Sequence, residues 1–233
     1  DAAERAGLMF GPDVATSSRA CIGGMIGNNS CGARSVRFGK TVDHLVELDV
    51  VLADGSTVTL GSAVGAEAPR DRLVTEILGI AERHGDEVER RFPDLTRRVS
   101  GYNLDALLGP APNPAHVIAG SEGTLGLVTA ATMSLVPRPG ARALGVVTFD
   151  DLGRAMDAVP RILETDPTAV ELIDRLLVSL ARASEEFGPR AAFVRGDPEA
   201  LLVVEYDGPT AEDAAEGLTR LRASVRGLAE VSD

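Results

Sequence analysis

A glycine-rich stretch at residues 12–39 constrains the fold of this chain more than any other feature of its sequence. Small polar residues separate its five glycines, which are Gly23, Gly24, Gly27, Gly32 and Gly39. With so little side-chain bulk, a ligand can approach the backbone closely. Successive backbone N–H groups can also form concave sites for anions and polar ring edges. The alternative is a surface loop that joins two ordinary elements, and composition alone leaves both interpretations open.

A second glycine cluster occupies residues 119–129, with the sequence Ala-Gly-Ser-Glu-Gly-Thr-Leu-Gly-Leu-Val-Thr. It follows a short apolar run and precedes a β-branched segment, so we expect a turn between strands. A Rossmann fingerprint needs a helix N-terminus directly after its glycines, and none is expected here. The Gly-Lys-Ser/Thr sequence of a phosphate-binding P-loop is also absent. The cluster therefore indicates neither of these nucleotide-binding folds.

The composition limits the classes of partner. The chain has 233 residues, 44% of them hydrophobic, which is enough for one large or two modest domains. Its formal net charge is −12, and aromatic residues make up only 3%. Nucleic acid would be repelled by this charge, and base-stacking platforms are not expected. An anionic membrane surface is disfavoured for the same reason, and no apolar run is long enough to be a transmembrane segment.

The chain contains two cysteines, Cys21 and Cys31. They form no Cys-x-x-Cys pair, so the sequence predicts neither a structural zinc site nor an iron–sulfur cluster within this chain. Two cysteines cannot build a disulfide framework, which favours a reducing, cytoplasmic location.

Residues 42–60 predict a β-hairpin, because apolar and polar residues alternate and Asp54-Gly55 is a strong two-residue turn. After a small-residue loop at 61–69, a helix is predicted over residues 70–92. Its inner face is expected to carry Leu73, Ile77, Ile80, Ala81 and Val88. A strand is predicted over residues 127–136, and the sequence Pro-Arg-Pro-Gly at 137–140 indicates a hinge or domain boundary.

After this boundary, predicted strands and helices alternate. The strands are expected at residues 143–149, 168–173 and 201–206, and the helices at 151–164, 174–187 and 209–225. The first helix is expected to bury Leu152, Ala155, Met156, Val159 and Leu163. The second is expected to bury Leu176, Leu177, Leu180 and Ala181, and the third Ala211, Ala214, Leu218, Leu221 and Val225. The pattern predicts helices on one face of an antiparallel sheet.

Taken together, the glycine clusters resemble the family of FAD-dependent dehydrogenases and oxidases with the flavin fold of vanillyl-alcohol oxidase. Within it, the chain looks most similar to the D-lactate, glycolate and D-2-hydroxyglutarate dehydrogenase branch. The matching motifs are Gly11-Pro12-Asp13, Ile22-Gly23-Gly24-Met25-Ile26-Gly27-Asn28-Asn29, Cys31-Gly32-Ala33-Arg34, Phe38-Gly39-Lys40-Thr41, Val51-Leu52-Ala53-Asp54-Gly55 and Gly120-Ser121-Glu122-Gly123-Thr124-Leu125-Gly126. A further match, Gly101-Tyr102-Asn103-Leu104-Asp105, resembles the long members in which the flavin part is fused to an iron–sulfur part.

The resemblance implies an α+β fold with a mixed-sheet FAD-binding subdomain over residues 1–139. Part of a ferredoxin-like α+β cap domain for the substrate would follow over residues 140–233. It also implies an internal fragment of a longer enzyme, without the N-terminal subdomain and its pyrophosphate-binding loop. FAD is the implied cofactor. We expect residues 1–233 alone to retain little or no FAD, because that loop supplies the strongest anion contacts.

The resemblance also assigns residues to the cofactor site. The residues implied around the isoalloxazine and ribityl region are Pro12, Asp13, Thr16, Cys21, Gly23, Gly24, Gly27, Asn28 and Gly32. The residues implied to close over the cofactor are Glu122, Gly123, Gly126 and Val128. Many family members have a second proline after the aspartate, and this chain has Val14 there, which puts the turn around Asp13 in question.

No residue of this chain is expected to be catalytic, and none to bind a metal ion. The three histidines, His44, His84 and His116, are isolated in the sequence, and we favour a structural role for His44. In the family, the metal-binding histidines and the acid that takes the substrate proton lie further along the chain, and would fall beyond Asp233.

The sequence supports one leading function and two alternatives. The leading one is oxidation of a D-2-hydroxyacid, of the D-lactate, glycolate or D-2-hydroxyglutarate type, by hydride transfer to flavin N5. The fused relatives further imply an iron–sulfur domain or subunit as electron acceptor. The alternatives are a non-catalytic flavin-binding or assembly subunit of the same fold, and a reductase of this fold that uses a nicotinamide donor.

Overall fold

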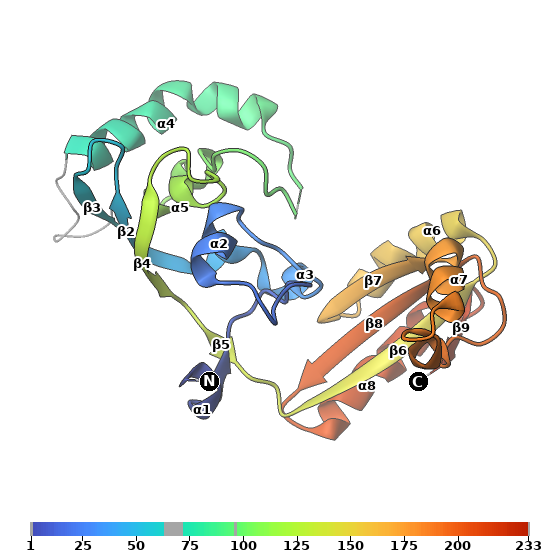
Figure 1. Ribbon diagram of the computed structural model, residues 1–233. Coiled ribbons are helices and arrows are strands. Elements are labelled where there is room, and N and C mark those ends of the chain that lie inside the picture. Colours follow the sequence, from blue (N-terminus) through green and yellow to red (C-terminus); the bar gives the residue numbers. More distant parts are fainter. Residues whose placement is uncertain (1, 63–71, 96, 233) are drawn as a thin grey trace. The chain divides into compact units, whose positions relative to one another are not determined.

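The structure, a computed structural model, describes residues 2–62, 72–95 and 97–232 (Figure 1). It divides into two compact units, Asp1–Pro137 and Arg138–Asp233. Each unit has a hydrophobic core of its own. The division falls within the Pro-Arg-Pro-Gly sequence that indicates a hinge.

The first unit is built on a three-stranded sheet. Its central strand β2 (Leu45–Val51) pairs with β3 (Thr57–Leu60) on one side and with β4 (Leu127–Met133) on the other. The predicted hairpin is confirmed, because Gly55 adopts φ +84° in the turn between β2 and β3. Where a mixed sheet is expected, the described strands are all antiparallel. A tight turn returns β3, and β4 runs back along the opposite edge of β2, so no parallel pair forms.

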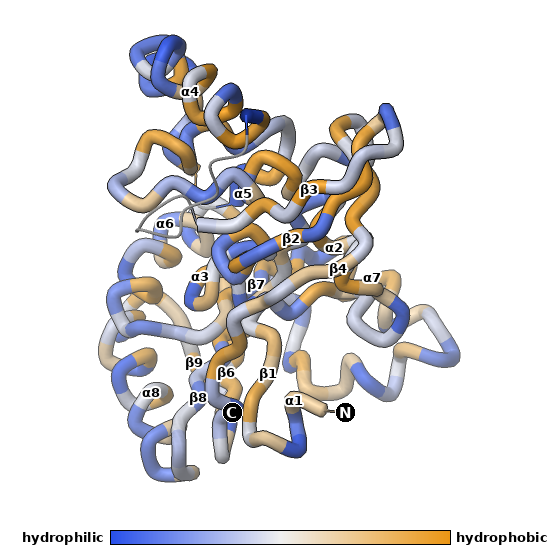
Figure 2. Tube along the Cα trace, turned by 90° about the vertical axis from the view of Figure 1, so that its left-hand side faces the viewer, coloured by the Kyte–Doolittle hydropathy of each residue, from blue (hydrophilic) through white to orange (hydrophobic). Residues whose placement is uncertain are grey.

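Helix α4 (Arg72–Arg91) confirms the predicted helix, and it buries Ala81 and Val88 of the predicted inner face together with Val74. Val74, Ala81 and Val88 are buried at seven-residue spacing, whereas Ile80 is 41% exposed. The helix is amphipathic, with hydrophilic and hydrophobic segments along its tube (Figure 2). Most of the predicted loop at 61–69 lies outside the described residues. Among the described helices, none is long and apolar enough to cross a membrane.

Short elements complete the first unit. They are α1 (Ala2–Arg5), β1 (Leu8–Met9), α2 (Ile22–Gly27), α3 (Ser35–Phe38), η1 (Thr41–His44), η2 (Asp105–Leu107), α5 (Ala115–Ile118) and β5 (Val136–Pro137). β1 and β5 form a separate antiparallel pair, so the single strand predicted at 127–136 is two strands. The apolar run before the second glycine cluster is helix α5, not a strand, because Pro114 at its N-cap favours a helical start.

The second unit has the strand order β7-β8-β6-β9 with antiparallel pairing throughout. Its elements are β6 (Ala141–Phe149), α6 (Leu152–Leu163), β7 (Ala169–Asp174), α7 (Arg175–Ala183), η3 (Gly188–Ala191), β8 (Ala200–Gly208), α8 (Ala211–Ser224) and β9 (Glu230–Ser232). Apart from α7 and η3, which lie between β7 and β8, the elements follow the βαββαβ order of the ferredoxin-like arrangement that the family resemblance implies.

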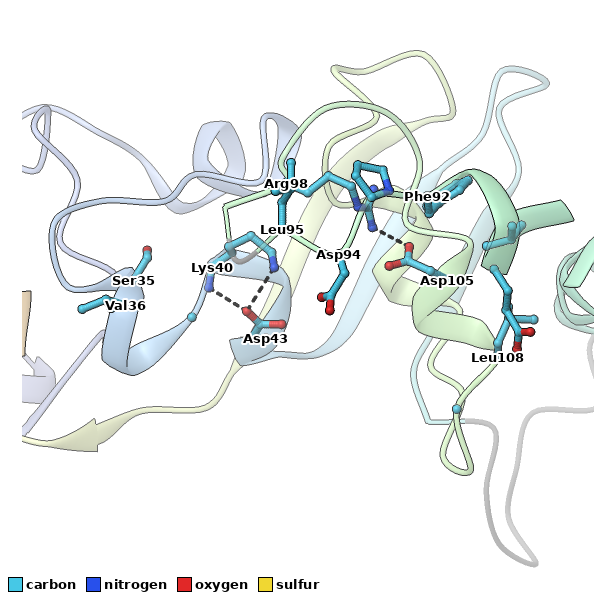
Figure 3. Close-up of a pocket in the computed structure, with 15 residues that line it drawn as sticks. Ser35, Val36, Lys40, Asp43, Phe92, Asp94, Leu95, Arg98, Asp105 and Leu108 are labelled. Carbon is cyan, nitrogen blue, oxygen red and sulfur yellow. Dashed lines mark hydrogen bonds and ion pairs between the residues drawn. The ribbon is translucent and has the colours of Figure 1, made fainter. Parts of the chain in front are cut away.

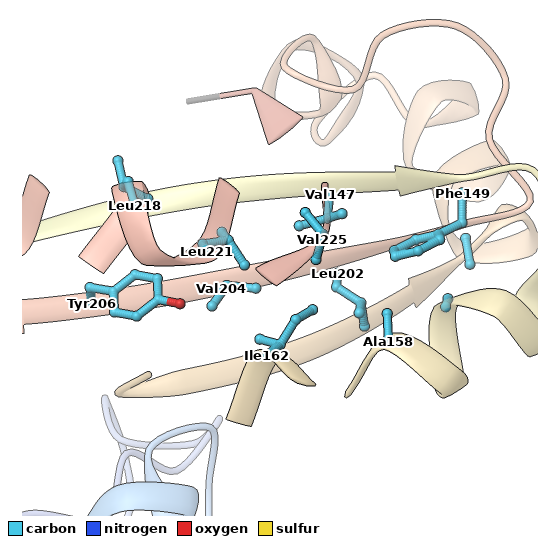
Figure 4. Packing of buried hydrophobic residues seen from close by; sticks show 12 residues of the cluster. Val147, Phe149, Ala158, Ile162, Leu202, Val204, Tyr206, Leu218, Leu221 and Val225 are labelled. Carbon is cyan, nitrogen blue, oxygen red and sulfur yellow. The ribbon is translucent and has the colours of Figure 1, made fainter. Parts of the chain in front are cut away.

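Its main core lies between the sheet and two helices, α6 and α8 (Figure 4). Val147, Leu202 and Val204 point from the sheet into this core. Side chains of β8 alternate, so Leu201 points to the opposite face, where it meets Val178 of α7. The expectation that all three helices cover one face is therefore wrong for α7.

The predicted inner face of α7 is also wrong, and in α6 only Ala155 of the predicted residues is buried. In α6 the buried residues are Ala155, Ala158 and Ile162. In α7 the buried residue is Val178. The larger side chains that were expected inside are exposed, namely Leu152, Met156, Leu163, Leu176, Leu177 and Leu180. Small alanines allow α6 to approach the sheet closely, which larger residues at those positions would prevent. The inner face of α8 is as expected, apart from Ala211, which is exposed.

Candidate functional site

Helix α2 carries the first three glycines of the long glycine-rich stretch. Its buried face consists of Met25 and Ile26. A Cβ atom placed on Gly23, Gly24 or Gly27 would meet no heavy atom of the described residues within 4 Å. Glycine in a helix costs roughly 0.5–1 kcal/mol relative to alanine. Because contacts within the chain do not explain these glycines, we interpret the bare face as a surface for close approach of a ligand.

The structure brings the two glycine clusters together at the C-terminal end of α2. The backbone N–H of Gly120 donates to the carbonyl oxygen of Ile26 over 2.9 Å. The N–H of Glu122 donates to the carbonyl oxygen of Gly27, also over 2.9 Å. These bonds satisfy carbonyl groups that the helix end leaves without an intrahelical donor. The second cluster is thus fixed directly beside the bare glycine face.

Backbone strain marks the same junction. Asn29 has φ +49° and Glu122 has φ +52°, and they are the only non-glycine residues with positive φ among the described residues of the first unit. Left-handed backbone costs a residue with a side chain about 1–2 kcal/mol. Such strain persists where the surrounding structure enforces it, and it clusters at functional sites.

The side chain of Asn29 adds a buried donor at this junction. Asn29 is fully buried, and its Oδ1 accepts a hydrogen bond from the N–H of Val42 over 3.0 Å. This bond sets the orientation of the amide, and Nδ2 has no hydrogen-bond partner among the described residues. An unpaired buried donor costs about 1–3 kcal/mol, so an acceptor from a ligand or water would be stabilising.

Asn29 was missed by reasoning from the sequence, which chose its neighbour Asn28. Asn28 is exposed, and its Oδ1 accepts a hydrogen bond from the Ser30 hydroxyl over 2.5 Å. One sequence signal could have distinguished them. Asparagine tolerates the left-handed backbone that follows a helix end, and Asn29 is the residue just after the C-cap.

A cavity of about 600 Å³ lies between α2 and β4. It is lined by Phe10, Ile22, Gly23, Ile26, Val128, Thr129, Ala130, Ala131, Met133 and Leu135. Two of the predicted cofactor residues, Gly23 and Val128, face it from opposite elements. Its volume lies within the roughly 300–1,000 Å³ range of small-molecule sites, and its mostly apolar wall suits a flat aromatic ring.

The predicted residues Pro12, Asp13 and Gly32 belong to a different contact. Pro12 is buried, and the carbonyl of Asp13 accepts a hydrogen bond from the N–H of Ala33 over 3.1 Å. The carboxylate of Asp13 lies 3.6 Å from the guanidinium of Arg34. A Cβ on Gly32 would overlap the carbonyl of Asp13. Glycine is therefore required at position 32 by the chain's own fold.

The remaining predicted residues also differ in whether contacts within the chain explain them. A Cβ on Gly126 would lie 2.5 Å from Val50 Cγ1, so this glycine also serves the fold. Gly123 adopts φ +78° in open space next to the strained Glu122. Thr16 and Cys21 are exposed. Cys21 is the N-cap residue of α2 and makes no side-chain capping bond.

A second cavity, of about 740 Å³, lies elsewhere in the first unit and contains none of the predicted cofactor residues (Figure 3). Its two cations are held by neighbouring carboxylates. Lys40 Nζ lies 3.8 Å from Asp43, and Arg98 lies 2.5 Å from Asp105. Because these charges are paired, the cavity is a weaker candidate for an anionic cofactor than the α2–β4 cavity.

The histidines have structural surroundings. His44 is buried, and its Nε2 lies 2.7 Å from the carbonyl oxygen of Phe38, whereas His84 is exposed. Nε2 of His116 lies 3.1 Å from the carbonyl oxygen of Leu45. Among the described residues, no group of three or more histidine, cysteine or acidic side chains could hold a metal ion.

His116 should make the stability of the protein depend on pH. Burial lowers the pKa of His116 below its ordinary value of 6.5, and the Leu45 carbonyl and the Asp43 carboxylate oppose this shift only in part. As the pH falls through the ordinary value, the unfolded chain takes up a proton that the folded chain resists. The free energy of unfolding should therefore decrease.

The measurement is urea unfolding between about pH 8 and about pH 5, a range that spans the ordinary histidine pKa. The variant His116→Gln keeps an N–H donor for the Leu45 carbonyl but cannot titrate, so its stability should fall less steeply with acid. Identical slopes for the two proteins would contradict the assignment. The exposed His84 provides the substitution control, and His84→Gln is measured in the same way.

Two family profiles match the chain. The FAD binding domain matches residues 1–61, and the C-terminal domain of FAD linked oxidases matches residues 138–232. The chain belongs to the FAD-linked oxidase family, and FAD is the cofactor of this family. The residues fit that cofactor, because they provide a bare glycine face, an apolar cavity and the unpartnered buried Nδ2 of Asn29.

Similar proteins include enzymes that act on several hydroxyacids. D-2-hydroxyglutarate dehydrogenase of Pantoea ananatis is 27% identical over 237 residues, covering 95% of this chain and 23% of that protein. Glycolate oxidase subunit GlcD of Bacillus subtilis is 28% identical over 211 residues, covering 89% of this chain and 35% of that protein. D-lactate dehydrogenase of Archaeoglobus fulgidus is 27% identical over 218 residues, covering 93% of this chain and 39% of that protein. The chain thus spans only part of the length of these relatives.

Solved structures support the fold. Alkyldihydroxyacetonephosphate synthase matches with a TM-score of 0.63 and 18% identity, covering 98% of this chain and 37% of that one. p-Cresol methylhydroxylase matches with a TM-score of 0.61 and 14% identity, covering 98% of this chain and 41% of that one. At these identities the likeness concerns the fold alone, and the fold class expected from the sequence is confirmed.

Proposed function

We propose that the protein oxidises a D-2-hydroxyacid with FAD bound at the junction of α2 and the turn at residues 120–126. The observation that carries this proposal is the bare glycine face of α2, hydrogen-bonded to the second cluster beside an apolar cavity. The names of the relatives support a substrate of the D-2-hydroxyglutarate, glycolate or D-lactate type.

The residues of this chain would bind and orient the cofactor. When bound, FAD supplies the hydride acceptor, at flavin N5, for the hydrogen on the α-carbon of the substrate. Gly23 and Gly24 would admit a flat ring without steric conflict. Ile22 and Val128 would exclude water from one side of it, which strengthens electrostatic interactions at the reacting atoms. The amide of Asn29 would donate a hydrogen bond to a ligand oxygen or an intervening water.

Two further points belong to this proposal. The electrons would pass to an iron–sulfur domain or subunit, a view supported by the Gly-Tyr-Asn-Leu-Asp motif at residues 101–105. A cytoplasmic location is supported by the two free cysteines, Cys21 and Cys31.

The test is anaerobic reduction of the full-length, flavin-loaded protein. D-Lactate, glycolate and D-2-hydroxyglutarate are mixed with it separately, and the visible flavin absorption is followed in time. At least one of them should bleach the flavin, whereas its L-enantiomer, where one exists, should be about 100-fold slower or inactive. Bleaching by a reduced nicotinamide but by no hydroxyacid would favour a reductase. A protein that binds FAD but is reduced by neither would favour the alternative of a flavin-binding or assembly subunit.

A further inference from the structure

The segment at residues 97–105, here called the brace, contacts both glycine clusters without belonging to either. At its start, the guanidinium of Arg97 donates a hydrogen bond to the carbonyl oxygen of Gly32 over 2.5 Å. Gly32 belongs to the first cluster, at the point where it packs on Asp13. The brace is therefore tied to the stretch that carries α2.

The middle of the brace holds the start of the second cluster. Asn103 is buried, and its Nδ2 donates to the carbonyl oxygens of His116 and Ala119, over 3.1 and 2.8 Å. A Cβ on Gly120 would lie only 3.1 Å from the carbonyl oxygen of Gly101, so the two backbones are in close contact. Gly120 also adopts φ +84°, which favours glycine.

The Tyr102 hydroxyl holds the other end of the same turn. It lies 2.9 Å from Thr124 Oγ1, and Thr124 Oγ1 in turn donates to the carbonyl oxygen of Ser121 over 2.6 Å. A threonine hydroxyl has a single hydrogen, so Tyr102 must be the donor to Thr124. This chain of bonds closes the turn that contains the strained Glu122 and Gly123.

An ion pair inside the brace joins its two ends, and a ring contact ties it to Phe92, the residue after α4. Arg98 forms an ion pair with Asp105 at 2.5 Å, and both residues line the cavity shown in Figure 3. The guanidinium of Arg98 also lies 4.8 Å from the centre of the Phe92 ring. Partial burial of Arg98 makes this pair more effective than one at the surface. The internal ion pair and the Phe92 contact stiffen the brace, so that it can hold the turn in a strained geometry.

We infer that the brace sets FAD affinity by holding the turn at residues 121–124 against the end of α2, with Tyr102 as a positioning residue. The inference rests on the proposed function, because it assumes that this turn closes over FAD. Tyr102 acts through Thr124 and the turn, so its loss should alter the bound cofactor more than the fold of the apoprotein.

The experiment compares Tyr102→Phe, Thr124→Val and the double variant in the full-length protein, with Thr124→Ser as the control. FAD is removed and titrated back, and its dissociation constant and visible spectrum are recorded. Each single variant should bind FAD about five- to tenfold more weakly, with a changed fine structure of the flavin band. The double variant should bind no more weakly than Thr124→Val, because that single variant already removes the bond lost in Tyr102→Phe as well as the bond to the Ser121 carbonyl. Thr124→Ser keeps the hydroxyl and should bind like the wild type.

Three results would overturn the inference. One is an unchanged FAD dissociation constant and flavin spectrum in Tyr102→Phe. Another is a drop in the urea midpoint of the apoprotein that accounts for the whole loss of affinity. The third is additive losses in the double variant, which would mean that the two hydroxyls act separately. Failure of the wild-type protein to bind FAD would instead reject the proposed function, so the two failures are distinguishable.

Discussion

Replacement of Gly24 by leucine should abolish FAD incorporation while leaving the apoprotein folded. Position 24 is exposed on α2, and a Cβ there meets nothing within 4 Å, so the chain itself has room for a larger side chain. Leucine is a better helix former than glycine by about 0.5–1 kcal/mol, so the apoprotein should be no less stable. A ring held against the glycine face would collide with the new side chain. We expect FAD affinity to fall at least about 100-fold, a loss of roughly 3 kcal/mol.

The measurement pairs the visible flavin spectrum of the purified full-length protein with urea unfolding of its apoprotein. Gly79→Leu is the matched control, since Gly79 lies in α4 and a Cβ there would lie 3.1 Å from the flexible end of the Arg83 side chain. That variant should keep its flavin. A Gly24→Leu protein with undiminished yellow colour would contradict the assignment of the glycine face to the cofactor.

Replacement of Gly32 by alanine, unlike replacement of Gly24, should disrupt the fold itself and prevent the first unit from folding. A Cβ at position 32 would overlap the carbonyl of Asp13, which is backbone and cannot move aside as a side chain could. The hydrogen bond from Ala33 N–H to the same carbonyl would be lost as the segments separate. Overpacking typically lowers the free energy of unfolding by about 1–3 kcal/mol. A backbone clash combined with a lost hydrogen bond should reach or exceed the upper end of that range.

The control is the same change at Gly23, where a Cβ meets open space. Gly23→Ala should raise the urea midpoint of the apoprotein slightly, whereas Gly32→Ala should lower it strongly or give insoluble protein. Equal midpoints for the two variants would show that the contact between Asp13 and Gly32 is not as close as described. The two glycines belong to one glycine-rich stretch of the sequence but have different roles in the structure.

The sequence could predict most strands, because their signals are local. Asp54-Gly55 and the alternation around it specify the β2–β3 hairpin without reference to the rest of the chain. The helix faces were harder to predict. Along α6 the large residues Leu152 and Met156 dominate any hydrophobic pattern, yet they are exposed, and Ala158 and Ile162 are buried beside the expected Ala155. That choice depends on how closely the helix approaches the sheet, which no local pattern encodes.

The position of α7 on the opposite face had a signal that was not used. β8 is apolar at successive positions, with Leu201 and Leu202 both buried, so both faces of this strand must be covered. An antiparallel sheet with one solvated face would show alternation instead. The uniform apolar run therefore predicts helices on both sides of the sheet.

For the candidate site, the sequence could indicate that both glycine clusters serve one ligand, but not which glycine does so. Gly24 and Gly32 look alike in the sequence. They differ only in what a Cβ would meet, and Gly32 meets Asp13, far back in the chain. Asn28 and Asn29 are distinguished in the same way, by the distant N–H of Val42 that binds Asn29. Such long-range contacts can be read only from the structure.

The most direct test of the cofactor site is hydrogen–deuterium exchange of the full-length protein with and without FAD. Bound FAD should slow amide exchange at residues 22–29 and at residues 120–126 together, because both clusters would contact it. Amides of α8, which belongs to the second unit and packs on the sheet of that unit, provide the internal reference. Protection of both clusters is the result we predict. Stoichiometric FAD binding without slower exchange in either cluster would contradict the site.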